Sequence, residues 1–357
     1  VTVNGTVTAN SGNGIDIDNF GSEGVTVNAS NADGTSLISA VDDHGVLIDN
    51  YNGGAVNVTV DNVLAEEEGI AADNYAGGTS VSITVNGTVT STTEEGITVD
   101  NYGSEGVTVN VTNADGSAAV ISDEDGIELE NYNGGGVTVV VDNVTNASEE
   151  GIDVDNEDVV STFVSVTVNG AVTSAGGDAI DVYNEGVGDV TVYAANADGT
   201  VQLSSAAGRG IDIYNDNEGA VSVTVDNIMS EEEGIDNENE IGTTSDSVTV
   251  TGTVTSATEN GINILSSYNS PRFAVHFDGL DLLNYSGGAI DITVDNATGD
   301  QGYGVYAYND ASSTSLSLTA YGTLSGYSYG AFLRNDGSGD LIVDISNADG
   351  TALAEGN

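Results

Sequence analysis

The sequence lacks cysteine, lysine and tryptophan, and it contains a single proline. Without cysteine the chain has no disulfide bond, no catalytic thiolate and no cysteine-ligated zinc. Three arginines stand against 57 acidic residues, which gives the 357 residues a formal net charge of −54. Nucleic acids and anionic membrane surfaces are bound mainly through lysine and arginine, so we expect neither as a partner. No apolar run is as long as a membrane-spanning helix, so we expect no direct membrane insertion.

High acidity is common in disordered chains, but the order of the residues here predicts a folded protein. Hydrophobic residues make up 38% of the chain, and most of them are valine and isoleucine that alternate with polar residues. This period of two is typical of β-strands, and 48 glycines supply tight turns between them. No helical period of 3.6 residues persists, so the sequence predicts an all-β fold of short strands.

A motif of the form Gly-(Ile/Val)-x-(Val/Ile/Leu)-x-Asn recurs along the whole chain. Its glycines are Gly14, Gly45, Gly69, Gly96, Gly126, Gly151, Gly210, Gly234, Gly261, Gly279, Gly304 and Gly330, and a thirteenth copy begins at Ala179. Most copies lie 24 to 31 residues apart, with a second strand of the Val-Thr-Val type between them, as at Val107–Val109. This is the pattern of a parallel β-helix, or β-solenoid, whose stacked coils bury one continuous core. We predict about 13 to 14 coils.

A longer period of about 82 residues, or three coils, lies over the short one. Its markers are Val-(Asn/Thr)-Gly-(Thr/Ala)-Val around Gly5, Gly87, Gly170 and Gly252, and the turn Asn-Ala-Asp-Gly at Asn31, Asn113, Asn196 and Asn347. We expect one β-helix domain over residues 1–357, with super-repeats at about 1–80, 81–163, 164–247 and 248–315 and a partial one at 316–357. Neither end shows a cap, so we expect a segment of a longer rod, or ends that pair with a partner.

The sixth motif position is asparagine in 12 of the 13 copies. Side chains alternate across a strand, so this asparagine points inward together with the two aliphatic residues of the motif. A buried amide needs hydrogen-bond partners, and stacked asparagines supply them to one another as an internal ladder. The predicted ladder consists of Asn19, Asn50, Asn74, Asn101, Asn131, Asn156, Asn184, Asn215, Asn239, Asn284, Asn309 and Asn335, and Ser266 interrupts it.

The motif Gly-Ile-x-Val-x-Asn, the segment Val-Asn-Gly-Thr-Val-Thr-Ser at 85–91 and the lack of cysteine carry a family resemblance. Over its whole length the chain resembles the right-handed parallel β-helices of bacterial autotransporter passenger domains and large surface adhesins. The resemblance implies a right-handed coil and an extracellular or cell-surface location. A repeating rod without caps is a natural filament subunit, so the expected partners are copies of the chain, joined end to end or laterally, and cell-surface glycans. The first residues show no signal-peptide pattern, in which the chain departs from that family.

The fifth motif position is acidic in the first six copies, at Asp18, Asp49, Asp73, Asp100, Glu130 and Asp155. In a coiled stack these carboxylates lie above one another at about 4.8 Å. Each neighbouring pair then repels by about 0.9 kcal/mol even at the dielectric constant of water. Two ways of compensating this charge remain open. Either Ca²⁺ binds at ordered sites, because hard cations take six to eight oxygen ligands, or a salty medium screens the column diffusely. No cofactor is required, and Ca²⁺ is the candidate ion.

The segment 265–278 departs most from the repeat and contains Pro271, Arg272 and His276. Arg272 either pairs with nearby aspartates of its own chain or docks onto the acid column of another chain. We therefore interpret Arg272 and His276 as a candidate interface. An aromatic residue often follows the motif asparagine, and we expect these rings to stack into a row that closes the turn. They are Phe20, Tyr51, Tyr75, Tyr102, Tyr132 and Tyr285.

Together these features predict an extracellular structural protein, either a filament or matrix subunit or a surface adhesin stalk, and not an enzyme. The protein is expected to associate with itself or to present an acidic, repetitive surface. The alternative is a carbohydrate-active β-helix enzyme of the tailspike or pectinase type, since such enzymes share the fold. Asp42, Asp43 and His44 carry acid–base groups. Paired catalytic carboxylates need a defined separation across a cleft, so we interpret the adjacent Asp42 and Asp43 as a solvated turn. His44 has no second histidine nearby, so we expect no metal triad there.

Overall fold

The computed structural model describes residues 1–157, 161–216, 219–239, 245–257, 262–266, 280–284, 288–299, 303–309, 313–327, 329–346 and 353–356. These residues form strands and turns, and none of them belongs to a helix that is long and apolar enough to cross a membrane. The chain divides into two compact units, unit 1 at Val1–Gly176 and unit 2 at Gly177–Asn357. Each unit is a parallel β-solenoid whose turns contain up to three strands.

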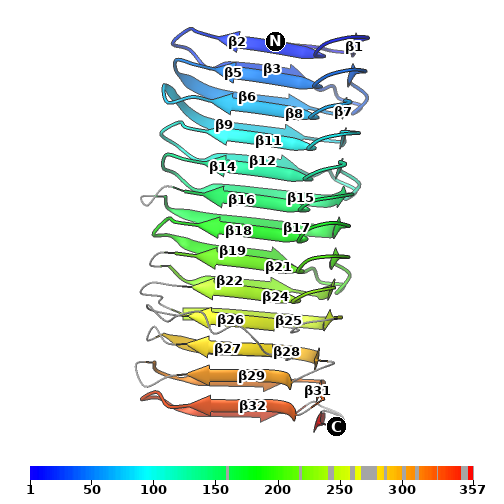
Figure 1. The fold of residues 1–357 in the computed structure, drawn as a ribbon. Helices are drawn as coiled ribbons and strands as arrows, with labels where there is room; N and C mark the ends of the chain where they lie inside the picture. Colours follow the sequence, from blue (N-terminus) through cyan, green and yellow to red (C-terminus); the bar gives the residue numbers. More distant parts are fainter. Residues whose placement is uncertain are drawn as a thin grey trace. The chain divides into compact units, whose positions relative to one another are not determined.

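Three rows of parallel strands run along unit 1, and strands of one row lie above one another in successive turns (Figure 1). Row 1 contains the motif strands β2 (Ile15–Asn19), β5 (Val46–Asn50), β8 (Ile70–Asn74), β11 (Ile97–Asn101), β14 (Ile127–Asn131) and β16 (Ile152–Asn156). Row 2 contains β3 (Val25–Ala29), β6 (Gly54–Val60), β9 (Gly78–Val85), β12 (Val107–Val111) and the first parts of β15 (Val137–Asn146) and β17 (Phe163–Ser174). Row 3 contains β1 (Thr6–Ala9), β4 (Leu37–Ala40), β7 (Asn62–Leu64), β10 (Thr88–Thr90), β13 (Ala119–Ile121) and the last parts of β15 and β17.

The same three rows occur in unit 2. Row 1 contains β18 (Ile180–Asn184), β21 (Ile211–Asn215), β24 (Ile235–Asn239), β26 (Ile262–Ser266), β27 (Leu280–Asn284), β29 (Tyr303–Asn309) and β32 (Tyr329–Asn335). Row 2 contains β19 (Asp189–Ala194), β22 (Val221–Val225), β30 (Leu316–Ala320), β33 (Leu341–Ile345) and the first parts of β25 (Ser245–Ser256) and β28 (Ala289–Gly299). Row 3 contains β20 (Gln202–Ser205), β23 (Asn227–Ser230), β31 (Thr323–Gly326), β34 (Leu353–Gly356) and the last parts of β25 and β28.

The core consists of the inward aliphatic side chains of all three rows. In one turn, Ile48 of row 1, Val58 of row 2 and Val63 of row 3 are each at most 2% exposed. Val58 is in register with Ile83 of the next turn, so inward residues stack on one another along the solenoid. Burying one such side chain contributes roughly 1.5–3 kcal/mol. Because a single turn cannot cover its own apolar side, stability depends on this stacking.

The predicted asparagine ladder runs through the core beside these aliphatic residues. In unit 1, Asn19 donates its side-chain amide to Asn50, Asn50 to Asn74 and Asn74 to Asn101, each at 2.7 Å, and Asn101 donates to Asn131 and Asn131 to Asn156 at 2.8 Å. In unit 2, Asn184 donates to Asn215 at 2.7 Å and Asn309 to Asn335 at 3.0 Å. The ladder is therefore confirmed at these positions. The backbones of Asn239 and Asn284 keep its register, and their side chains lie outside the described part of the chain.

The motif glycine is required by close packing between turns. A Cβ atom on Gly45 would lie 2.5 Å from the carbonyl oxygen of Gly69 and would collide with the side chain of Val63. A Cβ atom on Gly69 would meet Gly96 and Val89 in the same way. Neither Gly45 nor Gly69 has a positive φ, so the motif needs glycine here for space and not for backbone conformation.

The three-turn period has a structural cause at the corner between rows 2 and 3. Asp61 is only 1% exposed there. Its carboxylate accepts hydrogen bonds from the backbone N–H groups of Asn31 at 2.9 Å and Ser36 at 3.2 Å, which belong to the preceding turn. The corresponding bonds join Asp142 to Asn113 and Asp226 to Asn196. A buried carboxylate in every third turn thus fixes the Asn-Ala-Asp-Gly loop of the turn before it.

The fold class predicted from the sequence, an all-β parallel β-solenoid with an internal asparagine ladder, is confirmed. The described residues amount to about 11 turns of about 27 residues each, within the expected 24 to 31 residues. The right hand of the coil, the 13 to 14 coils of the full chain, the single domain and the super-repeat boundaries stay predictions.

Candidate functional site

The six acidic residues of the predicted cation column lie in register on the outward side of row 1 in unit 1. The paired residues are Asp18 and Asp49, Asp49 and Asp73, Asp73 and Asp100, Asp100 and Glu130, and Glu130 and Asp155. Adjacent rungs of a parallel stack lie about 4.8 Å apart. Asp18 is exposed, and the other five are half-buried. The structure therefore aligns these carboxylates as a continuous strip across six turns.

Crowding in this strip changes the acidity of its members. Burial, reinforced by the charges of Asp73 and Glu130, raises the pKa of Asp100 to about 7. Burial also raises the pKa of Asp73 above its ordinary value, and burial together with Glu130 raises the pKa of Asp155 to about 6. Burial and the neighbouring negative charges both disfavour the ionised form of these carboxyl groups. Cations bound along the strip would favour the ionised carboxylates and so lower these pKa values.

A row of stacked aromatic rings runs beside the acid column, as predicted. Ring centroids lie 4.5 Å apart for Phe20 and Tyr51, 4.7 Å for Tyr51 and Tyr75, 6.2 Å for Tyr75 and Tyr102 and 4.2 Å for Tyr102 and Tyr132. The hydroxyl of Tyr75 donates to the carboxylate of Asp73 at 3.1 Å and so ties the aromatic row to the acid column. Tyr285, the sixth predicted ring, lies outside the described residues.

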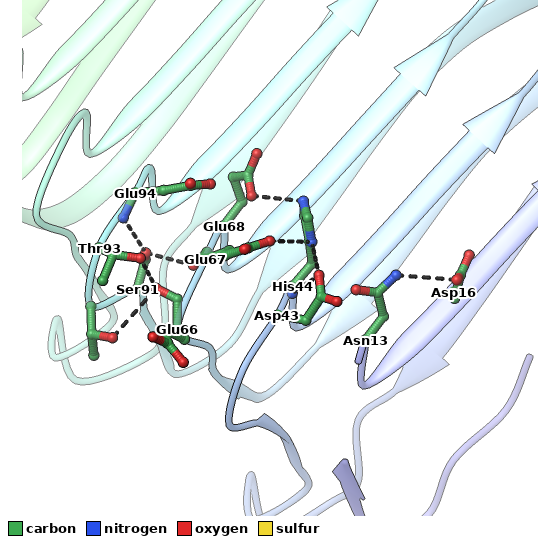
Figure 2. Close-up of polar contacts among 11 residues, drawn as sticks. Asn13, Asp16, Asp43, His44, Glu66, Glu67, Glu68, Ser91, Thr93 and Glu94 are labelled. Carbon is green, nitrogen blue, oxygen red and sulfur yellow. Dashed lines mark hydrogen bonds and ion pairs between the residues drawn. The ribbon is translucent and has the colours of Figure 1, made fainter. Parts of the chain in front are cut away.

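A second group of acidic side chains lies on the turns that lead into row 1. We call this group the turn ridge. In unit 1 it comprises Asp43, His44, Glu66–Glu68, Glu94, Glu95, Asp125, Glu149 and Glu150. The residues before the glycines of five successive copies are His44, Glu68, Glu95, Asp125 and Glu150. Figure 2 shows the beginning of the ridge, where His44 lies between Asp43 of its own turn and the pair Glu67 and Glu68 of the next turn.

His44 is the only basic side chain in the sequence of unit 1, which has no lysine or arginine. Its Nδ1 lies 2.5 Å from Asp43 and 3.2 Å from Glu67, and its Nε2 lies 2.7 Å from Glu68. Burial disfavours the charged ring, but the hydrogen bond with Asp43 and the three carboxylates outweigh it, so the pKa of His44 is raised. Asp42 of this turn is exposed, whereas Asp43 and His44 are half-buried.

Further along the turn ridge, carboxylates gather where unit 1 supplies no arginine or lysine. Asp125 is 4% exposed and accepts a hydrogen bond of 2.6 Å from the backbone N–H of Glu150. Oxygens of Asp125, Glu149 and Glu150 lie within 4.8 Å of one another, as do oxygens of Asp125, Glu128 and Asp153. Burial, with the charge of Glu150, raises the pKa of Asp125 to about 8. Such clustered carboxylate oxygens are typical ligands of hard cations such as Ca²⁺.

Unit 2 has the corresponding arrangement with a cation of its own. Arg209 precedes Gly210, which is the place that Asp125 takes before Gly126. Its guanidinium lies 2.5 Å from Asp212, 3.2 Å from Glu233, 3.4 Å from Asp236 and 3.6 Å from Asp178. Burial opposes the charge of Arg209, but these carboxylates outweigh it and raise its pKa. The turn ridge therefore accommodates a cation between its turns where the sequence provides one.

Reasoning from the sequence found the acid column, and the acidic turns Glu66–Glu68, Glu94–Glu95 and Glu149–Glu150 are visible in the sequence beside it. It did not predict that His44 and Arg209 lie among such carboxylates. The signal that could have indicated this is the position immediately before each motif glycine, which is acidic or basic in most copies. Arg272 and His276, the predicted interface, lie outside the described residues and stay a prediction. Cation binding by the acid column also stays a prediction, although the residues are brought together as expected.

Comparisons with known proteins assign no family to the chain. No protein-family model matches it, and no match is found among the curated proteins or the solved structures. The acid column and the turn ridge are therefore interpreted from their own geometry.

Proposed function

We propose that this chain is an extracellular structural β-solenoid, either a filament or matrix subunit or the stalk of a surface adhesin. Cations held on its acidic side stabilise it and allow copies to associate. The observation that carries this proposal is the acid column, in which Asp73, Asp100 and Glu130 lie in register on consecutive turns. Stacked like charges oppose folding unless cations compensate them. Extracellular calcium modules bind at about 10⁻⁴–10⁻³ M, so weak sites of this kind suit a calcium-rich medium outside the cell.

Repetition supports a structural role. The same acidic and aromatic side chains recur turn after turn, so the surface offers many equivalent contacts along the solenoid. Copies of the chain, joined end to end or laterally, and cell-surface glycans are the proposed partners. The resemblance to adhesin β-helices supports the extracellular location. A carbohydrate-active enzyme of the same fold stays the alternative, and no contact described above favours it.

The geometry of the turn ridge favours ordered cations over purely diffuse screening. Arg209 occupies a position among four carboxylates from three turns, which is a specific place for one positive charge. The related group around Asp125 gathers its oxygens in unit 1, where the sequence offers no arginine or lysine. A divalent ion is the compensating charge that fits this second group.

The test compares cations at one fixed ionic strength. Melting temperature and sedimentation velocity of the purified chain are measured in Na⁺, Mg²⁺ or Ca²⁺ and again after chelation by EDTA. We expect Ca²⁺ to raise both quantities above their values in Na⁺, since a ligand at 100 times its Kd contributes about 2.7 kcal/mol to stability. Identical melting curves in all salts would reject ordered cation sites. A monomer in every salt would reject the structural-subunit role.

Two double variants distinguish the contribution of the acid column to the Ca²⁺ effect from that of negative charge elsewhere on the chain. Asp73→Asn combined with Asp100→Asn should diminish the Ca²⁺ effect, because both carboxylates lie inside the column. Glu23→Gln combined with Asp42→Asn removes the same charge from exposed turns and should leave the effect unchanged. Antibody labelling of intact producing cells tests the location. A signal that appears only after the cells are lysed would contradict it.

A further inference from the structure

The row 2 and row 3 strands of unit 1 present no charged side chain outward, although the whole chain has a net charge of −54. The outward acidic residues of the unit 1 strands lie on row 1, whereas row 3 presents hydroxyl, amide and aliphatic side chains. We call the second outward position of the row 3 strands the neutral face, and it comprises Thr8, Ser39, Leu64, Thr90, Ile121, Thr145 and Thr173. The outward charge of the strands of unit 1 is therefore confined to row 1.

The neutral face is a continuous column on stacked parallel strands. Leu64 is in register with Ser39 on one side and with Thr90 on the other, and Ile121 is in register with Thr90 and Thr145. Leu64 and Ile121 are each 43% exposed. Two aliphatic side chains thus stand in water at the centre of the column, with threonine methyl and hydroxyl groups beside them. Covering them would gain free energy in proportion to the apolar area removed from water.

We infer that the neutral face is the surface through which two copies of this chain associate laterally. This inference rests on the self-association proposed above and names the surface that serves it. A second copy of the chain is the proposed partner. The acidic sides of two copies repel each other, whereas two neutral faces can come into contact without desolvating an ion. A two-fold interface brings the same surface of both copies together, and the two columns have the same rung spacing.

Row 2 is the competing surface, and its chemistry fits association less well. Its outward residues include Asn57 and Thr108, both exposed, and most of its other outward positions in unit 1 are hydroxyl or amide side chains. Such groups are well hydrated, and burying them without good partners costs free energy. Row 3 differs because Leu64 and Ile121 supply apolar surface that water does not satisfy.

The borders of the neutral face connect association to cations. The acidic turns Glu66–Glu68 and Glu94–Glu95 follow β7 and β10 almost directly, so the turn ridge forms a charged rim beside the column. An uncharged centre with a polar rim is the usual anatomy of a protein interface. Two such rims repel each other until cations or salt neutralise them. The neutral face should therefore associate in Ca²⁺ and separate in EDTA at low ionic strength.

The experiment compares two double variants that add the same charge to different rows. Leu64→Asp with Ile121→Asp alters the neutral face, and Asn57→Asp with Thr108→Asp alters row 2 at exposed positions. Sedimentation equilibrium in Ca²⁺ buffer measures self-association, and circular dichroism with thermal melting monitors folding. We expect the row 3 variant to raise the dissociation constant about tenfold or more, because like charges then meet across the interface, and the row 2 variant to change it less than about twofold.

Each outcome decides a separate point. A folded row 3 variant that associates like the wild type overturns the neutral face and leaves the proposed function standing. A wild-type chain that stays monomeric in every salt overturns the self-association on which this inference rests, together with the filament or matrix role, and leaves only the adhesin stalk of the proposed function. Because the chain has no cysteine, cross-linking gives a second readout that needs no charge change. A bismaleimide should link copies of the Thr90→Cys variant and not copies of Asn57→Cys, and the reverse result would overturn the inference.

Discussion

The side-chain amide of Asn50 donates a hydrogen bond of 2.7 Å to Asn74, which lies 24 residues away in sequence and one turn away in the solenoid. Asn74 donates in turn to Asn101, also at 2.7 Å, and all three side chains are fully buried. Each amide thus serves as donor to one neighbour and acceptor from the other. The ladder joins consecutive turns through directional hydrogen bonds, which specify how the turns stack more precisely than the contacts of the aliphatic core do.

Replacing a middle member of the ladder should destabilise unit 1. Asn74→Ala leaves the donor of Asn50 and the acceptor of Asn101 without their partner, and each orphaned group costs on the order of 1–3 kcal/mol. Urea denaturation followed by circular dichroism measures the loss. Asn57→Ala, on the exposed outward side of β6, is the control and should change the free energy of unfolding by less than about 0.5 kcal/mol. Equal effects of the two variants would contradict a structural role for the ladder.

The ladder and the acid column could be predicted because Asn74 and Asp73 hold fixed places in the motif. Register between motif strands does not depend on the length of the turn that joins them. His44, Glu68 and Arg209 also hold a fixed place, directly before a motif glycine. Their contacts could not be predicted, because these depend on the path of the turns, and the copies that the turns join lie 24 to 31 residues apart. The separation of rows 2 and 3 is equally hidden, since β15 runs through both with a register shift after Val141.

A methyl group at the motif glycine should be costly. In Gly69→Ala the new Cβ would lie 2.5 Å from the carbonyl oxygen of Gly96 and collide with Val89, both of which are fixed by stacking. Overpacking of this kind costs about 1–3 kcal/mol. Gly5→Ala is the control, since a Cβ on Gly5 meets nothing within 4 Å. Thermal melting of the two variants checks the prediction, which fails if Gly69→Ala melts like the wild type.

Stability should fall as pH rises at low ionic strength without divalent cations. The pKa is raised to about 7 for Asp100 and to about 8 for Asp125, above the value of 3.8 expected for an unfolded aspartate. A carboxyl group with a higher pKa in the folded state binds more protons there, so it destabilises the fold once pH rises through that interval. We expect the melting temperature to decrease between about pH 4 and pH 8. A melting temperature that rises over this range would contradict the assignment.

A single substitution should remove part of that pH dependence. Asp100→Asn deletes one crowded carboxylate, so it should stabilise the chain at pH 8 by on the order of 2–4 kcal/mol and have little effect near pH 4. Asp42→Asn removes the same charge from an exposed turn and should leave the pH profile unchanged. Parallel profiles of the wild type and Asp100→Asn would show that the acid column does not set the pH response.

Removing the internal cation of unit 2 should make that unit depend on an added one. Arg209→Gln leaves Asp178, Asp212, Glu233 and Asp236 without the guanidinium that now lies among them, and breaking a partly buried ion pair costs on the order of 2–4 kcal/mol. Arg334→Gln is the matched control, because Arg334 is 59% exposed and pairs with the neighbouring Asp336 at the surface. Melting curves are measured with and without Ca²⁺. Ca²⁺ should raise the melting temperature of Arg209→Gln more than that of the wild type. The reason is that oxygens of Asp178, Asp181 and Asp212 lie within 4.8 Å of one another and suit a hard cation. The opposite result is an Arg209→Gln variant that is destabilised and whose melting temperature Ca²⁺ raises no more than that of Arg334→Gln. The turn ridge would then require a positive side chain that divalent ions do not replace.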